Sequence, residues 1–142
     1  MNKFIFLLLF LLCAALYSCD DSALPILKKE LTGANKIKIY FYEDSTGRFS
    51  NLKMIDFITS KDSINNFLGY ITEENFVNKN CLYSGMAEFY KNDSILMNME
   101  FSLMNNCEHI IFKTRDIMQS KKLKPEGINF LINTGNKLKN KL

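Results

Sequence analysis

The stretch ILMNMEFSL, residues 95–103, places an apolar side chain at every odd position. This period of two is typical of a β-strand with one buried face, because successive side chains of a strand point to opposite sides of a sheet. Two apolar runs flank it, CLYSGMAEFY at residues 81–90 and HIIFK at residues 109–113. The three runs predict an antiparallel meander over residues 81–113, with the 95–103 strand in its middle.

The apolar pattern predicts the register of the second hairpin in this meander. A two-residue loop at Asn105 and Asn106 pairs Phe101 with Ile110, so that both lie on the apolar face. Asparagine tolerates the left-handed backbone conformation that such short loops require. The chain is therefore predicted to turn at these two asparagines.

The first hairpin turns near Asn92 and Asp93. A two-residue loop there would place the charged Glu88 on the core face of the sheet. A three-residue loop places Ala87 and Phe89 on that face instead, because a slip of one residue moves every side chain to the other face. The three-residue loop is therefore the prediction.

Two strands and a helix are predicted before the meander. Residues 36–42 (KIKIYFY) alternate with period two, and residues 52–58 (LKMIDFI) form a second strand paired with them as a hairpin. A helix is predicted over residues 58–74, with Thr59 and Asp62 approximating a capping box at its start. Its apolar stripe follows the spacing i, i+3, i+4, i+7 and consists of Ile64, Phe67, Leu68 and Ile71.

A final helix is predicted to begin near Pro125 and to end at Gly135. Its apolar stripe consists of Ile128, Leu131 and Ile132. The resulting order is ββαβββα, and the predicted class is α+β, a small antiparallel sheet with two helices packed on it. We expect a single domain over residues 35–135, a lipidated N-terminus and tether over residues 19–34, and a basic tail over residues 136–142.

The N-terminal segment differs from the rest of the chain. Residues 4–17 (FIFLLLFLLCAALY) are 14 apolar residues in a row behind a single Lys3. Fourteen is fewer than the roughly 17–25 residues that span a bilayer. A positive start, a short apolar run and a small residue at its end are typical of a secretory signal peptide, which is predicted for residues 1–18.

The residues at the end of this segment resemble the lipobox of bacterial lipoproteins. That pattern has Leu at −3, a small residue at −1 and an obligatory Cys at +1 of the cleavage site, and Leu16, Ser18 and Cys19 match it. Tyr17 departs from the small or aliphatic residue that is usual at −2. The resemblance covers about the first 22 residues of the chain and says nothing about the folded domain.

The resemblance implies that Cys19 receives a diacylglycerol thioether and becomes the new N-terminus. In many such proteins the freed amine is acylated too, and palmitate is the fatty acid expected here. Each buried methylene contributes about 0.8 kcal/mol, so two or more chains hold a protein stably on a membrane. We expect a lipid-anchored protein of the cell envelope, on the periplasmic side of a membrane or on the cell surface; the alternative is plain secretion, with Cys19 free or disulfide-bonded.

The four cysteines have different expected fates. Cys13 leaves with the signal peptide and Cys19 takes the lipid, so Cys81 and Cys107 remain. An even pair in an oxidising compartment favours a disulfide. The two residues start the outer strands of the meander, roughly 9–10 Å apart. A disulfide therefore requires Cys81 to bend across the end of the sheet from its preceding loop.

The face of the meander opposite the core mixes apolar and polar side chains. It is too apolar for a fully solvated face and too polar for a core. Either the C-terminal helix or the tether covers part of it, or it binds a protein partner, for which Met and Tyr are well suited. The candidate partner-binding residues are Met86, Tyr90, Leu96, His109 and Ile111.

No catalytic or metal-binding motif stands out. His109 is the only histidine, and Cys107, two residues before it, is expected to be oxidised. We therefore predict no enzymatic activity, no metal and no cofactor other than the lipid on Cys19. The net charge is +3, and residues 113–142 carry eight Lys/Arg against two Asp/Glu. In an exported protein this basic end favours anionic lipid or an acidic partner over nucleic acid; the alternative is a solvated helix face and tail with no partner.

The expected function is that of a small envelope lipoprotein whose domain binds a protein partner, as an inhibitor, an immunity-type neutraliser or an assembly accessory. The alternative is a structural or assembly lipoprotein with no discrete ligand. An enzyme is less favoured than either.

Overall fold

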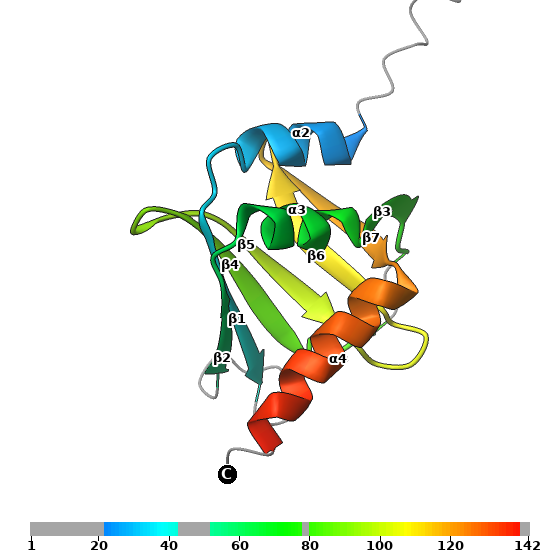
Figure 1. The fold of residues 1–142 in the computed structure, drawn as a ribbon. Coiled ribbons are helices and arrows are strands. Elements are labelled where there is room, and N and C mark those ends of the chain that lie inside the picture. Colours follow the sequence, from blue (N-terminus) through cyan, green and yellow to red (C-terminus); the bar gives the residue numbers. More distant parts are fainter. Residues whose placement is uncertain (1–21, 43–51, 78–79, 140–142) are drawn as a thin grey trace, which may run out of the picture.

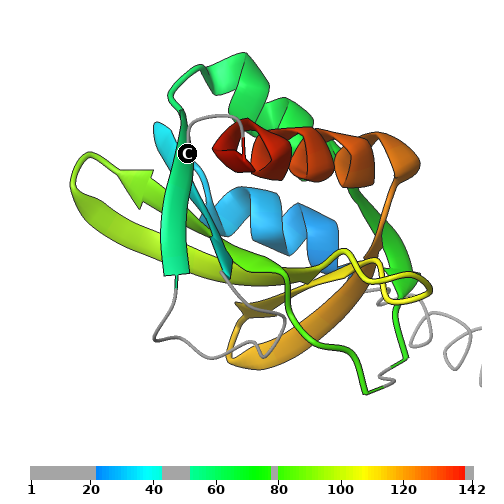
Figure 2. The same cartoon turned by 90° about the horizontal axis from the view of Figure 1, so that it is seen from below.

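The computed structural model describes residues 22–42, 52–77 and 80–139. In this part of the chain, an antiparallel sheet of seven strands carries three helices on one face (Figures 1 and 2). The elements are α2 (Ala23–Glu30), β1 (Lys36–Tyr42), β2 (Leu52–Ile58), α3 (Lys61–Gly69), β3 (Ile71–Asn75), β4 (Gly85–Lys91), β5 (Ser94–Ser102), β6 (His109–Thr114), β7 (Ile117–Leu123) and α4 (Pro125–Lys139). The predicted α+β class is confirmed, but the element order and the number of helices differ from ββαβββα.

The sheet curls around its helices. Its strand order, β2-β1-β4-β5-β6-β7-β3, places β2 and β3 at opposite edges, although only α3 separates them in the chain. In a flat sheet these edges would lie roughly 29 Å apart. A helix of 9 residues is only about 14 Å long. The curl brings the two edges toward the ends of α3, which crosses the covered face between them (Figure 1).

The register predicted for the second hairpin of the meander is confirmed. β5 and β6 pair Phe101 with Ile110, and both side chains are fully buried. The chain turns at Asn105 and Asn106, and Asn106 has a φ of 61°. Asparagine thus adopts the left-handed conformation that the turn needs.

The first hairpin has the predicted strand register beyond its turn, but its loop length differs from the prediction. Its closing strand pair leaves only Asn92 and Asp93 in the turn, so the loop has two residues and not the predicted three. A β-bulge then shifts the register by one residue beside Phe89. Phe89 and Ala87 therefore still lie buried on the core face, while Glu88 lies on the opposite face.

The helix predicted over residues 58–74 is shorter in the structure. α3 is capped by Ser60, whose Oγ accepts a hydrogen bond from a first-turn N–H at 3.3 Å, so Thr59 is not the cap. The helix ends at Gly69, and β3 follows from Ile71. The burial of the predicted stripe is confirmed, since none of its four members is more than 5% exposed. Ile71 reaches the core from a strand and not from the helix.

β3 and β7 were not predicted. β7 follows β6 through a two-residue turn at Arg115 and Asp116, whose φ values are 48° and 66°. Two positive φ values give the tight turn that matches the twist of a hairpin, and asparagine or glycine usually supplies them. Asp116 tolerates a positive φ but Arg115 does not favour one, so the sequence carries only a weak local signal for the hairpin.

The segment predicted as a tether contains α2, which packs on the sheet. Ala23, Leu27 and Leu31 are each less than 5% exposed and join the core. Their spacing of four residues places them on one face of a helix. The expectation of a free tether over residues 19–34 is therefore corrected, because the folded part begins near Ala23 and not at residue 35.

α4 begins at Pro125 as predicted but continues beyond Gly135. A Cβ added at Gly135 would lie 3.1 Å from the ring of Phe41. This glycine therefore allows the helix to approach the sheet closely, and it does not end the helix. Leu131 is buried whereas Ile132 is 41% exposed, so the apolar face of the helix is narrower than predicted.

Candidate functional site

The sheet face opposite α2, α3 and α4 carries most of the residues predicted to bind a partner. We call it the helix-free face, because none of the described helices packs on it (Figure 2). Its side chains come from β1, β4, β5 and β6, and they include Lys36, Lys38, Tyr40, Tyr42, Met86, Glu88, Tyr90, Asn98, Glu100, Ser102, His109 and Ile111. The interactions among these side chains decide how much of the face a partner can reach.

One cluster on this face is centred on Glu88. Its carboxylate accepts hydrogen bonds from the hydroxyls of Tyr40, at 2.8 Å, and Tyr90, at 2.5 Å. The Lys38 Nζ lies 4.3 Å from the centre of the Tyr90 ring, within cation–π range. Burial, reinforced by the hydrogen bond to Glu88, raises the pKa of the Tyr40 hydroxyl. The cluster ties the hydroxyls of both tyrosines to one carboxylate.

A second cluster is centred on Glu100. Burial raises the pKa of this carboxyl, and a hydrogen bond from Tyr42 partly opposes the shift. Burial also raises the pKa values of the Tyr42 and Tyr83 hydroxyls, and the negative charge of Glu100 adds to both shifts. Glu100 thus carries a partly desolvated carboxyl group on a face of the sheet that no described helix covers.

These clusters change the interpretation of the helix-free face. Met86 is 9% exposed, Tyr90 is 7% exposed and His109 is 2% exposed. Ile111 is half-buried, and Leu96, beside the β-bulge, is half-buried against the core. The predicted candidates therefore do not form an exposed patch, because Met86, Tyr90 and His109 are each at most 9% exposed.

His109 is held by its surroundings and is not open to solvent. Its Nδ1 lies 2.6 Å from the carbonyl oxygen of Cys107. Its ring stacks on Phe76 at 4.2 Å with an interplanar angle of 7°, and the Tyr83 ring lies 6.0 Å away. These contacts give His109 a structural setting that offers no access to a substrate.

Cys81 and Cys107 form the predicted disulfide, with their Cα atoms 5.9 Å apart. Cys81 lies in the loop before β4, as expected from the need to bend across the end of the sheet. Because the sulfur of Cys107 is bonded to that of Cys81, it cannot act with His109 as a nucleophile.

The end of the sheet near α2 exposes apolar side chains. The turns joining β4 to β5 and β6 to β7 lie at this end, and the backbone N–H of Arg115 donates to Glu30 of α2 at 3.1 Å. Ile95 is 53% exposed, Ile117 is 61% exposed and Met118 is 63% exposed. We call the end of the sheet that carries these three residues the turn-end patch. Ile117 and Met118 are neighbours in β7 and therefore lie on opposite faces of the sheet there. The sequence prediction missed Ile117 and Met118 as surface residues because it did not include β7.

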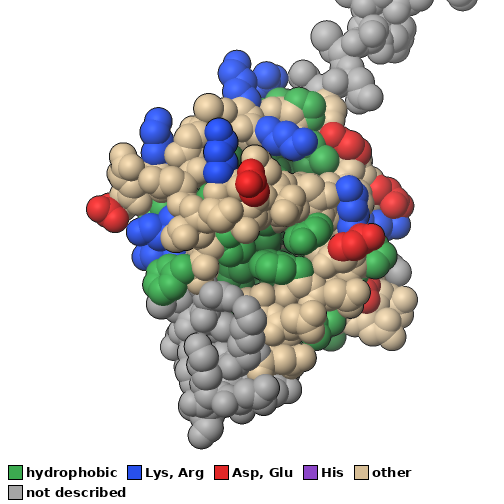
Figure 3. All heavy atoms as spheres, in the orientation of Figure 1, with side chains coloured by type: hydrophobic (Ala, Val, Ile, Leu, Met, Phe, Trp, Pro, Cys, Tyr) green, Lys and Arg blue, Asp and Glu red, His purple; other side chains and the backbone are tan. Residues whose placement is uncertain are grey.

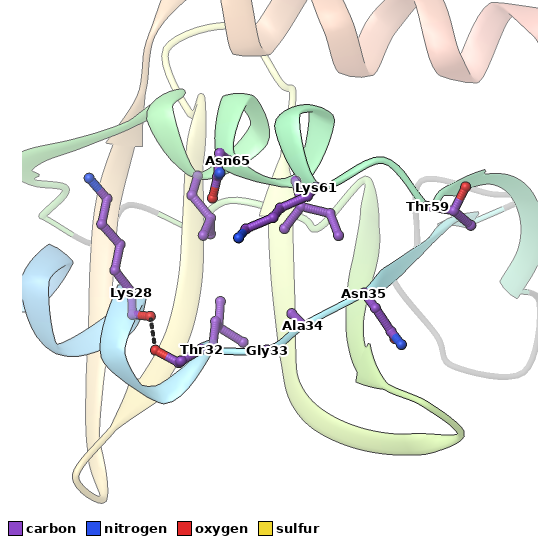
Figure 4. A pocket seen from close by; sticks show the side chains of 11 residues that line it. Lys28, Thr32, Gly33, Ala34, Asn35, Thr59, Lys61 and Asn65 are labelled. Atoms are coloured by element: carbon purple, nitrogen blue, oxygen red, sulfur yellow. Dashed lines mark hydrogen bonds between the residues drawn. The ribbon is translucent and has the colours of Figure 1, made fainter.

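A pocket of about 610 Å³ lies between the loop that follows α2 and the first turns of α3 (Figure 4). Its floor is apolar and its rim is polar. Lysine side chains lie over α2 and α3 on this side of the molecule (Figure 3). The residues that line it are Lys28, Leu31, Thr32, Gly33, Ala34, Asn35, Thr59, Lys61, Ile64, Asn65 and Leu68. Sequence reasoning missed the pocket, because its two walls are brought together only by the packing of α2.

The described residues also bear on metal binding and on membrane crossing. No group of three or more His, Cys, Asp or Glu side chains there could hold a metal ion. No helix in the same part of the chain is long and apolar enough to cross a membrane. Cys19 and the predicted signal peptide lie outside the described residues.

The chain matches no protein-family model, no curated protein and no solved structure in the comparisons. A functional assignment therefore depends on the residues and geometry described above.

Proposed function

We propose that this protein is a lipid-anchored lipoprotein of the cell envelope whose domain binds a protein partner at the membrane surface. The observation that carries the proposal is Cys19, which follows Leu16 and Ser18 at the end of a 14-residue apolar run. The disulfide between Cys81 and Cys107 agrees with export, because disulfides persist outside the reducing cytosol.

The position of α2 supports a domain held close to the membrane. Only Asp20 and Asp21 separate Cys19 from Ser22, the N-cap of α2. Three peptide units span at most about 11 Å. The Ser22 hydroxyl also hydrogen-bonds Glu73 in β3, which ties the start of α2 to the sheet. A lipidated Cys19 would thus keep the domain against the bilayer surface.

The turn-end patch is the best candidate for the partner surface. Three large apolar side chains, Ile95, Ile117 and Met118, are each more than half exposed there. Because Met118 lies on the helix-free side of β7 and Ile117 on the opposite side, a partner would contact this end of the sheet from both faces. The domain would then act as an inhibitor, an immunity-type neutraliser or an assembly accessory.

One observation favours the structural alternative. On the helix-free face Tyr40 and Tyr90 both bind Glu88, and Tyr90 is only 7% exposed. A structural or assembly lipoprotein would be expected to have its large sheet face covered in this way. That protein would have no discrete ligand.

The anchor is tested by substitution of the lipid-bearing cysteine. Cys19→Ser should abolish labelling by radioactive fatty acid and release the protein from membranes. Cys13→Ser is the matched control and should leave both unchanged, because Cys13 lies within the discarded segment. Retention of label on Cys19→Ser would rule out the lipoprotein proposal.

The partner surface is tested by affinity capture from detergent-solubilised envelopes. Met118→Asp should lose a protein that the unmodified chain retains, because a charge in the patch opposes apolar contact. Lys29→Asp, an exposed change on α2, should retain it. The same captured proteins with Met118→Asp as with the unmodified chain would argue against the turn-end patch as the contact.

A further inference from the structure

The pocket between α2 and α3 has two chemically distinct parts. Leu31, Ile64 and Leu68 form its floor, and each is at most 5% exposed. Its rim consists of exposed polar side chains: Lys28, Thr32, Asn35, Thr59, Lys61 and Asn65. A volume of about 610 Å³ falls within the range of about 300–1,000 Å³ that is usual for small-molecule sites.

The charge at the rim has one sign. Lys28 and Lys61 line the pocket, and no Asp or Glu lines it. Figure 4 shows Lys28 rising from α2 on one side and Lys61 reaching from α3 into the space between them. Among the described residues neither ammonium group forms an ion pair, whereas Lys36, Lys113 and Lys122 each pair with a carboxylate.

The two acidic residues next to the rim lysines in these helices do not neutralise the pocket. Glu30 accepts a hydrogen bond from the backbone N–H of Arg115, and neither Glu30 nor Asp62 lines the cavity. An apolar floor beneath two unpaired cations is complementary to a ligand with an apolar body and an anionic end.

We propose that this pocket binds a single-chain amphiphile with an anionic head group, with the acyl or alkyl chain over the floor and along Ala34 and the methylene stems of the rim lysines, and the head between the ammonium groups of Lys28 and Lys61. A fatty-acid carboxylate and an alkyl phosphate share this chemistry. The site does not depend on lipidation of Cys19 and would exist in an unanchored protein. The binding experiment can therefore succeed or fail whether or not Cys19 is lipidated.

Binding is measured by titration with soluble eight-carbon probes. The protein is the chain from residue 19 onward with Cys19→Ser, because the buried residues of the described part all lie between Ala23 and Thr134. Octyl phosphate and octanoate are added in separate titrations followed by amide NMR shifts, which should move at residues 31–35 and in α3. The probe that binds more tightly, octyl phosphate or octanoate, identifies the preferred head group.

Three further probes separate the contributions of charge and chain. Octanol should bind about tenfold more weakly than the better anion, because each of the two exposed lysines contributes roughly threefold to the affinity for an anion. Octyltrimethylammonium and inorganic phosphate should not shift these amides. Equal binding of octanol or of octyltrimethylammonium, or binding of inorganic phosphate as tight as that of octyl phosphate, would overturn the proposal.

Variants of exposed residues test the location without disturbing the core. Lys28→Gln combined with Lys61→Gln should weaken binding about tenfold, while Lys29→Gln, which lies outside the pocket, should leave it unchanged. Asn65→Trp should block the pocket and abolish binding. Asn66→Trp, the neighbouring exposed position outside it, should not. Unchanged binding in Asn65→Trp, with an intact amide spectrum, would show that the ligand binds elsewhere.

Discussion

Glu100 lies on the helix-free face, yet burial raises the pKa of its carboxyl. The folded state therefore holds the proton more tightly than the unfolded state does. For such a group the contribution to stability is fully present below the unfolded pKa, about 4.3. It is lost as the pH rises through the higher pKa of the folded protein. At neutral pH the charged carboxylate thus weakens the fold.

Glu100→Gln should raise the thermal unfolding temperature at pH 7, because the amide carries no charge to desolvate and still accepts a hydrogen bond from Tyr42. Near pH 3.5 the two proteins should unfold at similar temperatures, since Glu100 is then protonated in both states. Thermal unfolding followed by circular dichroism measures both. Glu74→Gln, an exposed carboxylate paired with Lys122, is the control and should not stabilise at pH 7. A lower unfolding temperature for Glu100→Gln at pH 7 would contradict this account.

Among the elements, α2 decides where the folded domain starts. It has 8 residues, too few to be stable as an isolated helix. Its stability must come from packing, and Leu27 at its centre is fully buried among residues of the sheet and of α3. Packing α2 onto the sheet also creates one wall of the pocket, so the helix links the N-terminal segment to the proposed binding site.

Leu27→Ala should lower the free energy of unfolding by about 2–5 kcal/mol, the usual range for such a truncation in a packed core. Lys29→Ala, on the exposed side of the same helix, should change it by less than about 0.5 kcal/mol. Urea unfolding of both variants measures the difference. If Leu27→Ala lowered the free energy of unfolding as little as Lys29→Ala does, α2 would not be part of the packed core, and the segment would be a tether.

For the whole molecule, the disulfide joins the loop before β4 to the loop before β6. Its two cysteines are 26 residues apart in the sequence, and the segment between them contains β4 and β5. It therefore crosslinks the centre of the sheet at the end remote from α2. In the chain-entropy account a loop of this length contributes about 3–4 kcal/mol, mainly by restricting the unfolded chain.

Cys81→Ala combined with Cys107→Ala should lower the free energy of unfolding by about 3–4 kcal/mol, while the native circular dichroism spectrum is retained. The unmodified protein under reducing conditions should unfold with nearly the same stability as the double variant. Urea titration measures both. Two reactive thiols per chain from Cys81 and Cys107 in the denatured, unreduced protein would show that the bond is absent.

The sequence by itself determined the central meander. The apolar pattern of residues 95–103 was enough to pair Phe101 with Ile110 and to place Phe89 on the core face. These register predictions succeed because the alternation of side chains along a strand is a local property. A shift of one residue would move every apolar side chain from the core face to the opposite face. The disulfide between Cys81 and Cys107 followed from the cysteine count and the same strand order.

Only the tertiary structure decided the rest. α2 is too short to form without its packing partners. The turn at Arg115 and Asp116 holds an arginine, which does not favour positive φ, in the left-handed conformation, and Glu30 of α2 accepts a hydrogen bond from its backbone N–H. The cluster on the helix-free face depends on Tyr40 of β1 meeting Glu88 of β4 across strands. The pocket likewise needs the walls of α2 and α3 side by side. Contacts between residues distant in sequence set all four features, and a local pattern carries no information about them.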